Sequence, residues 1–370
     1  MLRSPWFWVS VALIAAGVAL TALLGVFRWL ALALALAVFL LVGILLLSVY
    51  AIKPKDAPAL PKLEQLPDHG RISVVHDCDL TMGKPFRDIG DGLALLYLLG
   101  EPSVDLRAVT TTYGNGPVDM TTLTARQLLS QLDVQDVNVI RGAAGPDHDP
   151  GSNQAAMWLV DKVNARPNEL VILATGALTN LKHAWALDED FFRKIRSLYL
   201  AGGVTGKLVW SGHQLQERSL SLDPEAAHRV IHADCPVTIT PAEAGLTAIF
   251  RSPQFAALQA LQDPVSNLIT RRTRLWFGVM RLWFRDDGFP MWESVAATAL
   301  THPEHLLVER VHLPTSIQDL HTGRLVTDPD FAGPVRLVRR VQDYDGFIRS
   351  HFAAWQRLGH SVVTSRTSIS

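Results

Sequence analysis

Four aspartates lie close together in one short segment, ISVVHDCDLTMGKPFRDIGDGLALLYLL, which spans residues 72–99. Asp77 and Asp79 end one apolar run, and Asp88 and Asp91 precede a second one. Carboxylates in such a position could accept a phosphoryl group, move a proton, or bind a hard divalent cation. An aspartate directly before a helix is also a common N-cap, and Asp91 stands before GLALL. Three interpretations are therefore open: a phosphatase nucleophile, a metal site, or a solvated turn.

The elements that must position these acids alternate along the chain after residue 70. Apolar, β-branched runs typical of strands are followed by segments with helical apolar spacing, such as DGLALLYLLG and DPEAAHRVIHA. This alternation predicts an α/β domain with a mostly parallel central sheet and helices on both faces. Ligands bind such sheets beyond the carboxyl ends of the strands. The polar residues that follow the predicted strands are Asp77, Asp79, Asn115, Thr175 and Glu217.

The D-x-D-x-T motif at residues 77–81 resembles the first motif of the haloacid-dehalogenase-like phosphatases. That resemblance implies a phosphoryl acceptor and an acid/base in the two aspartates, with Thr175 binding phosphate and Asp286 and Asp287 binding magnesium. It finds no convincing lysine for the third motif, and it leaves the polar residues after the later strands without a role. A magnesium phosphatase is therefore kept as an alternative.

Six motifs in collinear order cover more of the chain, roughly residues 70–350. After DCD and an insertion, the series continues with DIGDGLALLYLL, VTTTYGN, LATGALTNL, SLYLAGG, ERSLSLDPEAA and MWESVAATALTHPE. Together they resemble the nucleoside hydrolase family, the calcium-dependent N-ribohydrolases of the inosine-uridine-preferring type. The resemblance implies the family's α/β fold and hydrolysis of the N-glycosidic bond of a nucleoside or related N-ribosyl compound by a calcium-activated water.

The resemblance also implies roles for individual residues. The Ca²⁺ ligands would be Asp79, Asp91, the backbone carbonyl of Thr175, and Glu293 at the family's last calcium aspartate. Asp79 would also act as the general base, and Asn115 would assist it by holding water and ribose. The expected substrate-binding residues are Asp77, which would also brace the acids, Asn115, Glu217, Ser219, Trp292 and His213.

Several positions depart from the family pattern. Gly90 stands where the family has the first aspartate of its pair, a ribose contact, and Ser219 stands where it has an asparagine. Trp292 replaces a histidine that in some members helps to protonate the leaving base. A buried hydroxyl without its partner costs about 1–3 kcal/mol. The first alternative is therefore a catalytically degenerate, membrane-tethered protein that binds a nucleoside or calcium, ahead of the phosphatase.

The N-terminus accounts for the high apolar content, 48% hydrophobic residues in a 370-residue chain. Arg28 is the only charge between residues 6 and 52. We expect a transmembrane hairpin over residues 1–55, with spans at about 6–26 and 30–50 and a turn at VFRWL; a single anchor or a signal peptide is the alternative. Flanking positive charges favour a cytoplasmic domain. A Pro- and Lys-containing linker is predicted for residues 56–70 and the α/β domain for residues 71–370.

The charge balance and the cysteines limit the partners. A net charge of −1 gives no nucleic-acid signature, and two separated cysteines fit a reducing compartment. We expect a small nucleoside-like substrate and a membrane as partners; the resemblance adds a homo-oligomer as an open expectation. The Arg- and Trp-rich segment 271–285 is interpreted as a lid over the site, with binding to an anionic bilayer as the alternative.

Overall fold

The computed structural model describes residues 5–50, 70–328 and 330–368. The chain divides into two compact units, Met1–Ala51 and Ile52–Ser370. Each unit is described separately below. The predicted linker at residues 56–70 lies, except for Gly70, outside the described residues.

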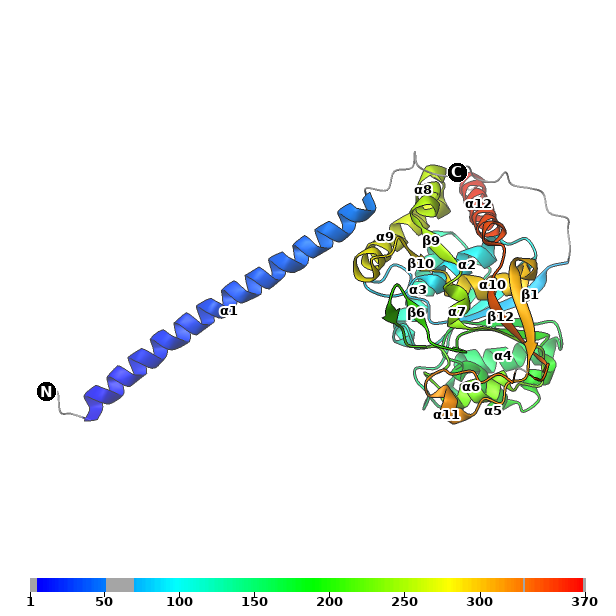
Figure 1. The fold of residues 1–370 in the computed structure, drawn as a ribbon, viewed down its shortest axis with the longest axis horizontal. Helices are drawn as coiled ribbons and strands as arrows, with labels where there is room; N and C mark the ends of the chain where they lie inside the picture. Colours follow the sequence, from blue (N-terminus) through cyan, green and yellow to red (C-terminus); the bar gives the residue numbers. More distant parts are fainter. Residues whose placement is uncertain (1–4, 51–69, 329, 369–370) are drawn as a thin grey trace. The chain divides into compact units, whose positions relative to one another are not determined.

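The first unit contains one continuous helix, α1 (Pro5–Tyr50), of 46 residues (Figure 1). The predicted hairpin is therefore wrong, because the helix runs through VFRWL without a turn. This segment contains neither glycine nor proline, and the single preceding Gly25 costs only about 1 kcal/mol in a helix interior. Ala19–Leu45 is long and apolar enough to cross a membrane, and a signal sequence near an N-terminus has the same character. Two spans are not supported.

An eight-stranded sheet forms the centre of the second unit, in the order β11-β12-β8-β5-β4-β1-β2-β3. Every neighbouring pair is parallel except β11 and β12, so the predicted mostly parallel sheet is confirmed. The strands are β1 (Ile72–Cys78), β2 (Val104–Thr111), β3 (Asn138–Arg141), β4 (Val171–Ala174), β5 (Ser197–Ala201), β8 (Val237–Thr240), β11 (Leu306–Val311) and β12 (Val335–Val341).

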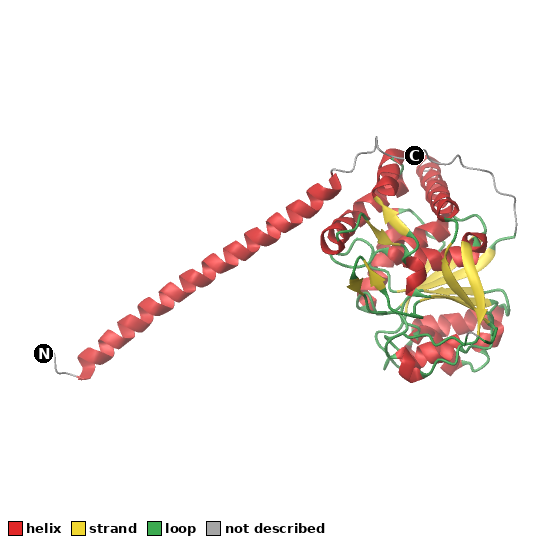
Figure 2. Cartoon of the chain, viewed as in Figure 1, coloured by secondary structure: helices red, strands yellow, loops and turns green. Residues whose placement is uncertain are grey.

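Helices cover both faces of this sheet, as Figure 2 shows. One layer contains α2, which contacts both α10 and α12, and the other contains α4, α5 and α6. Two short hairpins, β6–β7 (Val209–Trp210 and His213–Gln214) and β9–β10 (Ile249–Arg251 and Gly288–Pro290), lie outside the main sheet. The helices are α2 (Gly90–Gly100), α3 (Val118–Gln131), α4 (Gln154–Ala165), α5 (Thr179–Leu187), α6 (Pro224–Ile231), α7 (Ala242–Gly245), α8 (Ser252–Leu261), α9 (Pro264–Phe284), α10 (Trp292–Thr301), α11 (Ile317–Leu320) and α12 (Tyr344–Ser368).

The strand order reverses between β1 and β4. From β1 the chain adds β2 and β3 on one side, whereas β4, β5 and β8 extend the sheet on the other side. Asp77 pairs with Ala174, and the Thr175 N–H donates to the Asp77 carbonyl over 2.8 Å. The residues that follow β1 and β4 therefore lie side by side at the topological switch point, where sheets of this kind bind ligands.

Candidate active site

A pocket of about 490 Å³ opens beyond the carboxyl ends of the central strands. This volume falls within the range of small-molecule sites. Of the residues that sequence analysis assigned to the site, its lining includes Asp79, Asn115, Thr175, Glu217, Ser219, Trp292 and Glu293. Segments far apart in the chain, from residue 79 to residue 293, thus meet at one cavity.

Four carboxylates form what we call the acidic wall: Asp79, Asp88, Asp91 and Glu293. Asp79 follows β1, Asp88 precedes α2, and Asp91 and Glu293 lie in the first turns of α2 and α10. A helix N-terminus carries partial positive charge and free N–H groups, so it favours carboxylates. Asp79, Asp88 and Glu293 line the pocket, while Asp91 is buried behind them at 5% exposure.

Hydrogen bonds fix the inner part of the acidic wall. The Asp91 Oδ2 accepts the Asp79 N–H over 3.2 Å, and its Oδ1 accepts the Thr175 hydroxyl over 2.5 Å. The Asp79 Oδ2 accepts the Asn115 N–H over 2.6 Å. These bonds tie together the ends of β1, β2 and β4 and the start of α2, so the acids are held in place before any ligand arrives.

The acidic wall brings more carboxylate groups together than the neighbouring hydrogen-bond donors and cations can neutralise. Burial raises the pKa of Asp79 well above its usual range, and the charge of Asp91 adds to the effect. Burial also raises the pKa of Glu293 strongly, with contributions from Asp88 and Asp91, and that of Asp88 to about 6. The Glu293 Oε2 is buried without a hydrogen-bond partner. Such an arrangement is chemically suited to a hard cation.

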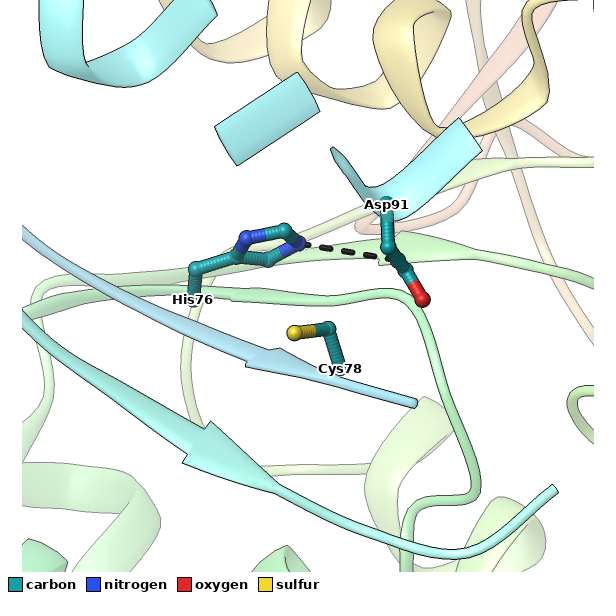
Figure 3. Close-up of side chains that lie close together, drawn as sticks. All are labelled: His76, Cys78 and Asp91. Carbon is teal, nitrogen blue, oxygen red and sulfur yellow. Dashed lines mark ion pairs between the residues drawn. The ribbon is translucent and has the colours of Figure 1, made fainter. Parts of the chain in front are cut away.

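His76 and Cys78 lie beside Asp91, as Figure 3 shows. The His76 Nε2 is 3.8 Å from the Asp91 Oδ1 and 3.0 Å from the Thr175 Oγ1. Burial lowers the pKa of His76 to about 4 and raises the pKa of the Cys78 thiol well above its usual range. A protonated thiol is a poor metal ligand. We therefore interpret these two side chains as support for Asp91.

Asp77 lies below the pocket and is fully buried. Its Oδ1 accepts the Thr110 hydroxyl over 2.5 Å and the Asn180 amide over 2.7 Å, whereas its Oδ2 has no partner. Burial raises the pKa of Asp77 to about 7. This placement suits the expected bracing role; the expected substrate contact stays a prediction.

Asn115 fastens the insertion between Asp79 and α2 to the end of β2. Its side-chain amide donates to the Thr81 hydroxyl over 2.5 Å and to the Asp88 carbonyl over 3.2 Å. The Arg87 guanidinium donates to the Asn115 carbonyl over 2.6 Å. Both hydrogens of the Asn115 side-chain amide are thus donated to other residues of the protein, so Asn115 positions the acidic wall. Its predicted contact with water or ribose stays a prediction.

A second wall of the pocket, the loop wall, consists of residues 202–203 and 217–221 after β5. The Glu217 Oε1 accepts the N–H groups of Gly203, Ser219 and Leu220 over 2.7–3.0 Å, and its Oε2 accepts that of Ser221 over 2.9 Å. Glu217 is only 8% exposed. Its carboxylate is thus satisfied by backbone donors of its own loop.

Ser219 and Thr175 link the two walls. The Ser219 hydroxyl lies 3.5 Å from the Thr175 carbonyl oxygen, the atom that the family resemblance assigns to the metal. Both residues line the pocket.

Aromatic side chains form the remaining wall. Trp210 from β6 packs on Phe284 from α9 with ring centroids 4.4 Å apart, and the Trp292 indole N–H donates to the Ala242 carbonyl over 3.1 Å. The predicted residue His213 is exposed and packs against Phe284, outside the pocket lining. The aromatic lining residues are Phe86, Trp210, Trp276, Phe284 and Trp292, so α9 contributes to the pocket as expected for a lid.

Besides the position of His213, two further outcomes differ from the residue assignments that the sequence suggested. Asp88 lines the pocket but was given no role; its position immediately before a helix at the end of the insertion was the available signal. Asp286 and Asp287, the magnesium pair of the phosphatase alternative, are outside the pocket lining and form ion pairs with Arg251 and Arg281.

Comparisons with known proteins point to one family. Residues 74–349 match the model described as inosine-uridine preferring nucleoside hydrolase. The pyrimidine-specific ribonucleoside hydrolase RihA of Shewanella sp. (strain MR-4) is 24% identical over 60% of this chain and 73% of the relative. The probable uridine nucleosidase 1 of Oryza sativa subsp. japonica is 25% identical over 65% and 82%, respectively.

Solved structures share the fold. The purine-preferring ribonucleoside hydrolase from Gardnerella vaginalis superposes with a TM-score of 0.67 at 19% identity, covering 78% of this chain and 99% of that one. A plant nucleoside hydrolase, PpNRh1, gives a TM-score of 0.66 at 20% identity, covering 78% and 99%, respectively. At these identities the similarity concerns the fold.

Proposed function

Because the chain belongs to the inosine-uridine preferring nucleoside hydrolase family, we propose that its α/β domain hydrolyses the N-glycosidic bond of a ribonucleoside. The single observation that carries this proposal is the acidic wall at the switch point of the sheet. Its acids come from three separate segments, and three of them, Asp79, Asp88 and Glu293, line a pocket large enough for a nucleoside. The phosphatase alternative is not supported, because its magnesium pair lies outside that pocket.

We further propose that the acidic wall holds a divalent cation, with calcium as the expected ion. Asp79, Asp91, Glu293 and the Thr175 carbonyl would hold it, since Ca²⁺ prefers six to eight hard oxygen ligands. The unpartnered Glu293 Oε2 and the raised pKa values of Asp79 and Glu293 fit this donor set. When bound, such an ion lowers the pKa of water and stabilises developing negative charge.

We assign to Asp79 the removal of a proton from the attacking water. Its carboxylate lines the pocket, and a cation held beside it would keep both the carboxylate and the water nucleophile ionised at neutral pH. In the balanced reaction the water oxygen bonds to C1′ of the ribose, and the C1′–N bond breaks with its electron pair leaving on the base. The departing nucleobase gains one proton, which balances the proton that Asp79 takes from water. Negative carboxylates around the sugar favour the oxocarbenium-like transition state.

The aromatic wall supplies a surface for the base. Flat rings such as Trp276 and Phe284 can stack on a purine or pyrimidine, and this burial excludes water from the reacting centre. Trp292 is not placed to protonate the leaving base, because its only N–H donates to the Ala242 carbonyl. Its proposed role is therefore limited to shaping the base pocket.

The proposal is tested by offering the full chain a panel of purine and pyrimidine ribonucleosides and a generic phosphate ester. We expect ribose release from at least one nucleoside and none from Asp79→Asn. Asp161→Asn is the matched control, because Asp161 is exposed on α4 and lies outside the pocket lining. Phosphate release would favour a phosphatase, and nucleoside-dependent thermal stabilisation without turnover would favour a binding protein.

A further inference from the structure

Gly90 and Glu293 are fitted to each other at the first turn of α2. A Cβ atom added to Gly90 would lie 1.7 Å from the Glu293 Oε2 and 2.7 Å from its Cδ, far closer than atoms can approach. Gly90 is not among the glycines with positive φ. Glycine is therefore needed at position 90 to make room for the Glu293 carboxylate. The backbone conformation at this position does not itself require a glycine.

Asp88 approaches the same point from the opposite side. Its Oδ2 accepts the Gly90 N–H over 3.3 Å and would lie 3.2 Å from a Cβ at that position. The carboxylates of Asp88 and Glu293 thus converge on Gly90, which has no side chain. Both line the pocket, and the Glu293 Oε2 has no donor within the protein.

The direction of Asp88 is set by its backbone. The Thr81 hydroxyl and the Asn115 amide both donate to the Asp88 carbonyl, over 2.9 and 3.2 Å. The Asn115 N–H also holds the Asp79 carboxylate. The insertion that carries Asp88 is therefore fixed to the same residue that fixes the proposed general base, and such pre-organisation is typical of a binding group.

We propose that Asp88 is a substrate-binding residue that accepts a hydrogen bond from a ribose hydroxyl and thereby selects ribonucleosides over 2′-deoxyribonucleosides. This inference rests on the proposed function and deepens it. A carboxylate accepts hydrogen bonds only, and the hydroxyl pair of a ribose offers two donors on adjacent carbons. Position 90 lacks a side chain and Glu293 fills its space. Asp88, just before α2, lines the pocket, whereas Asp91 in the first turn is buried.

The test measures both turnover and binding on the full chain, with inosine and uridine against their 2′-deoxy forms. For Asp88→Asn we expect kcat/KM for the ribonucleoside to fall about 10- to 100-fold, because a hydrogen bond to a charged acceptor is lost. We expect kcat/KM for the 2′-deoxy substrate to fall less than about threefold, because that substrate lacks the hydroxyl that would donate to Asp88. Calcium affinity, measured by calorimetry, should fall by less than about tenfold, because the change removes one nearby charge but none of the proposed cation ligands. Asp161→Asn is the control.

The outcomes separate this inference from the proposed function. Equal losses of kcat/KM for the ribonucleoside and its 2′-deoxy form, or a large loss of calcium affinity, would overturn the role of Asp88. The proposed hydrolase activity would still stand. A chain without turnover whose binding of ribonucleosides still depends on Asp88 would support the inference and overturn the catalytic proposal. If the unaltered chain neither turns over nor binds any nucleoside of the panel, both are overturned.

Discussion

Glu293 and Glu217 line the same pocket, but the acidic wall and the loop wall treat their glutamates in opposite ways. Glu217 accepts four backbone N–H groups within its own loop. Glu293 keeps one buried oxygen without a donor, and burial together with Asp88 and Asp91 raises its pKa. A glutamate in a pocket is thus no sign of ligand binding by itself. The informative difference is whether the protein satisfies its charge.

This comparison assigns different tasks to the two walls. The loop wall is complete without a ligand, so we infer that it shapes the cavity. The acidic wall is incomplete without a positive ion or hydrogen-bond donors from a substrate, so the chemistry is expected there. Four experiments test this division of tasks between the two walls.

Calcium affinity should separate the two glutamates most strongly. Glu293→Gln removes a charged ligand, and we expect calorimetry to show a loss of about 100- to 1,000-fold in affinity, since ligand charge tunes calcium binding over decades. Glu217→Gln is the matched control, because it makes the same change in charge and size outside the acidic wall. A comparable loss in both variants would contradict the division between the walls.

Stability should respond in the opposite order. In chelator, Glu217→Gln should lower the free energy of unfolding by about 2–3 kcal/mol, because a charged acceptor of several N–H groups is lost. Glu293→Gln should leave stability unchanged or raise it by about 1 kcal/mol, because it removes repulsion among the acids. Urea unfolding of both variants checks this, and equal destabilisation would count against the account.

Gly90→Ala tests the close approach at the start of α2. The added methyl group collides with the Glu293 carboxylate, so we expect a loss of about 2 kcal/mol in the free energy of unfolding. Shortening the acid in Gly90→Ala/Glu293→Asp should recover most of that loss. If the double variant were no more stable than the single one, Glu293 would not be the group that Gly90 accommodates.

The smallest effect per pH unit is a pH dependence of the stability of the chelated protein. The folded-state pKa of Asp88 is about 6, above the unfolded value of 3.8, so the folded state holds the proton more tightly. Its contribution to stability is therefore present below pH 3.8 and is lost as the pH rises through 6. Asp88→Asn removes this dependence. The difference in unfolding free energy between variant and unaltered chain should change by up to about 1.4 kcal/mol per pH unit between these values and stay flat above pH 7.

The sheet and the location of the site were predictable because their signals are local. Strand-forming runs end close to Asp77, Asn115 and Thr175, and parallel strands bring such ends to one edge. The continuous helix α1 was missed because the hairpin was inferred from length and one arginine. The segment VFRWL contains no residue that stops a helix.

Other features depend on distances that a sequence does not contain. An insertion separates Asp79 from α2, which hid the approach of Asp88 to the pocket. The contact of Gly90 with Glu293 joins residues 203 positions apart (293 minus 90). The saturation of Glu217 depends on a loop conformation that turns four N–H groups toward one side chain. The family resemblance assigned Glu293 to the metal and Glu217 to the substrate, but it could not show which of the two carboxylates the protein itself satisfies.

The central claim is that the acidic wall is a cation-dependent reaction centre. It is tested most directly by the rate of ribose release from a nucleoside that the full chain accepts, measured before chelation, after chelation, and after calcium is restored. We expect the rate to fall at least about 100-fold on chelation, because water loses its activation, and to recover with calcium. Ribose release that continues unchanged in the chelated protein would contradict the account.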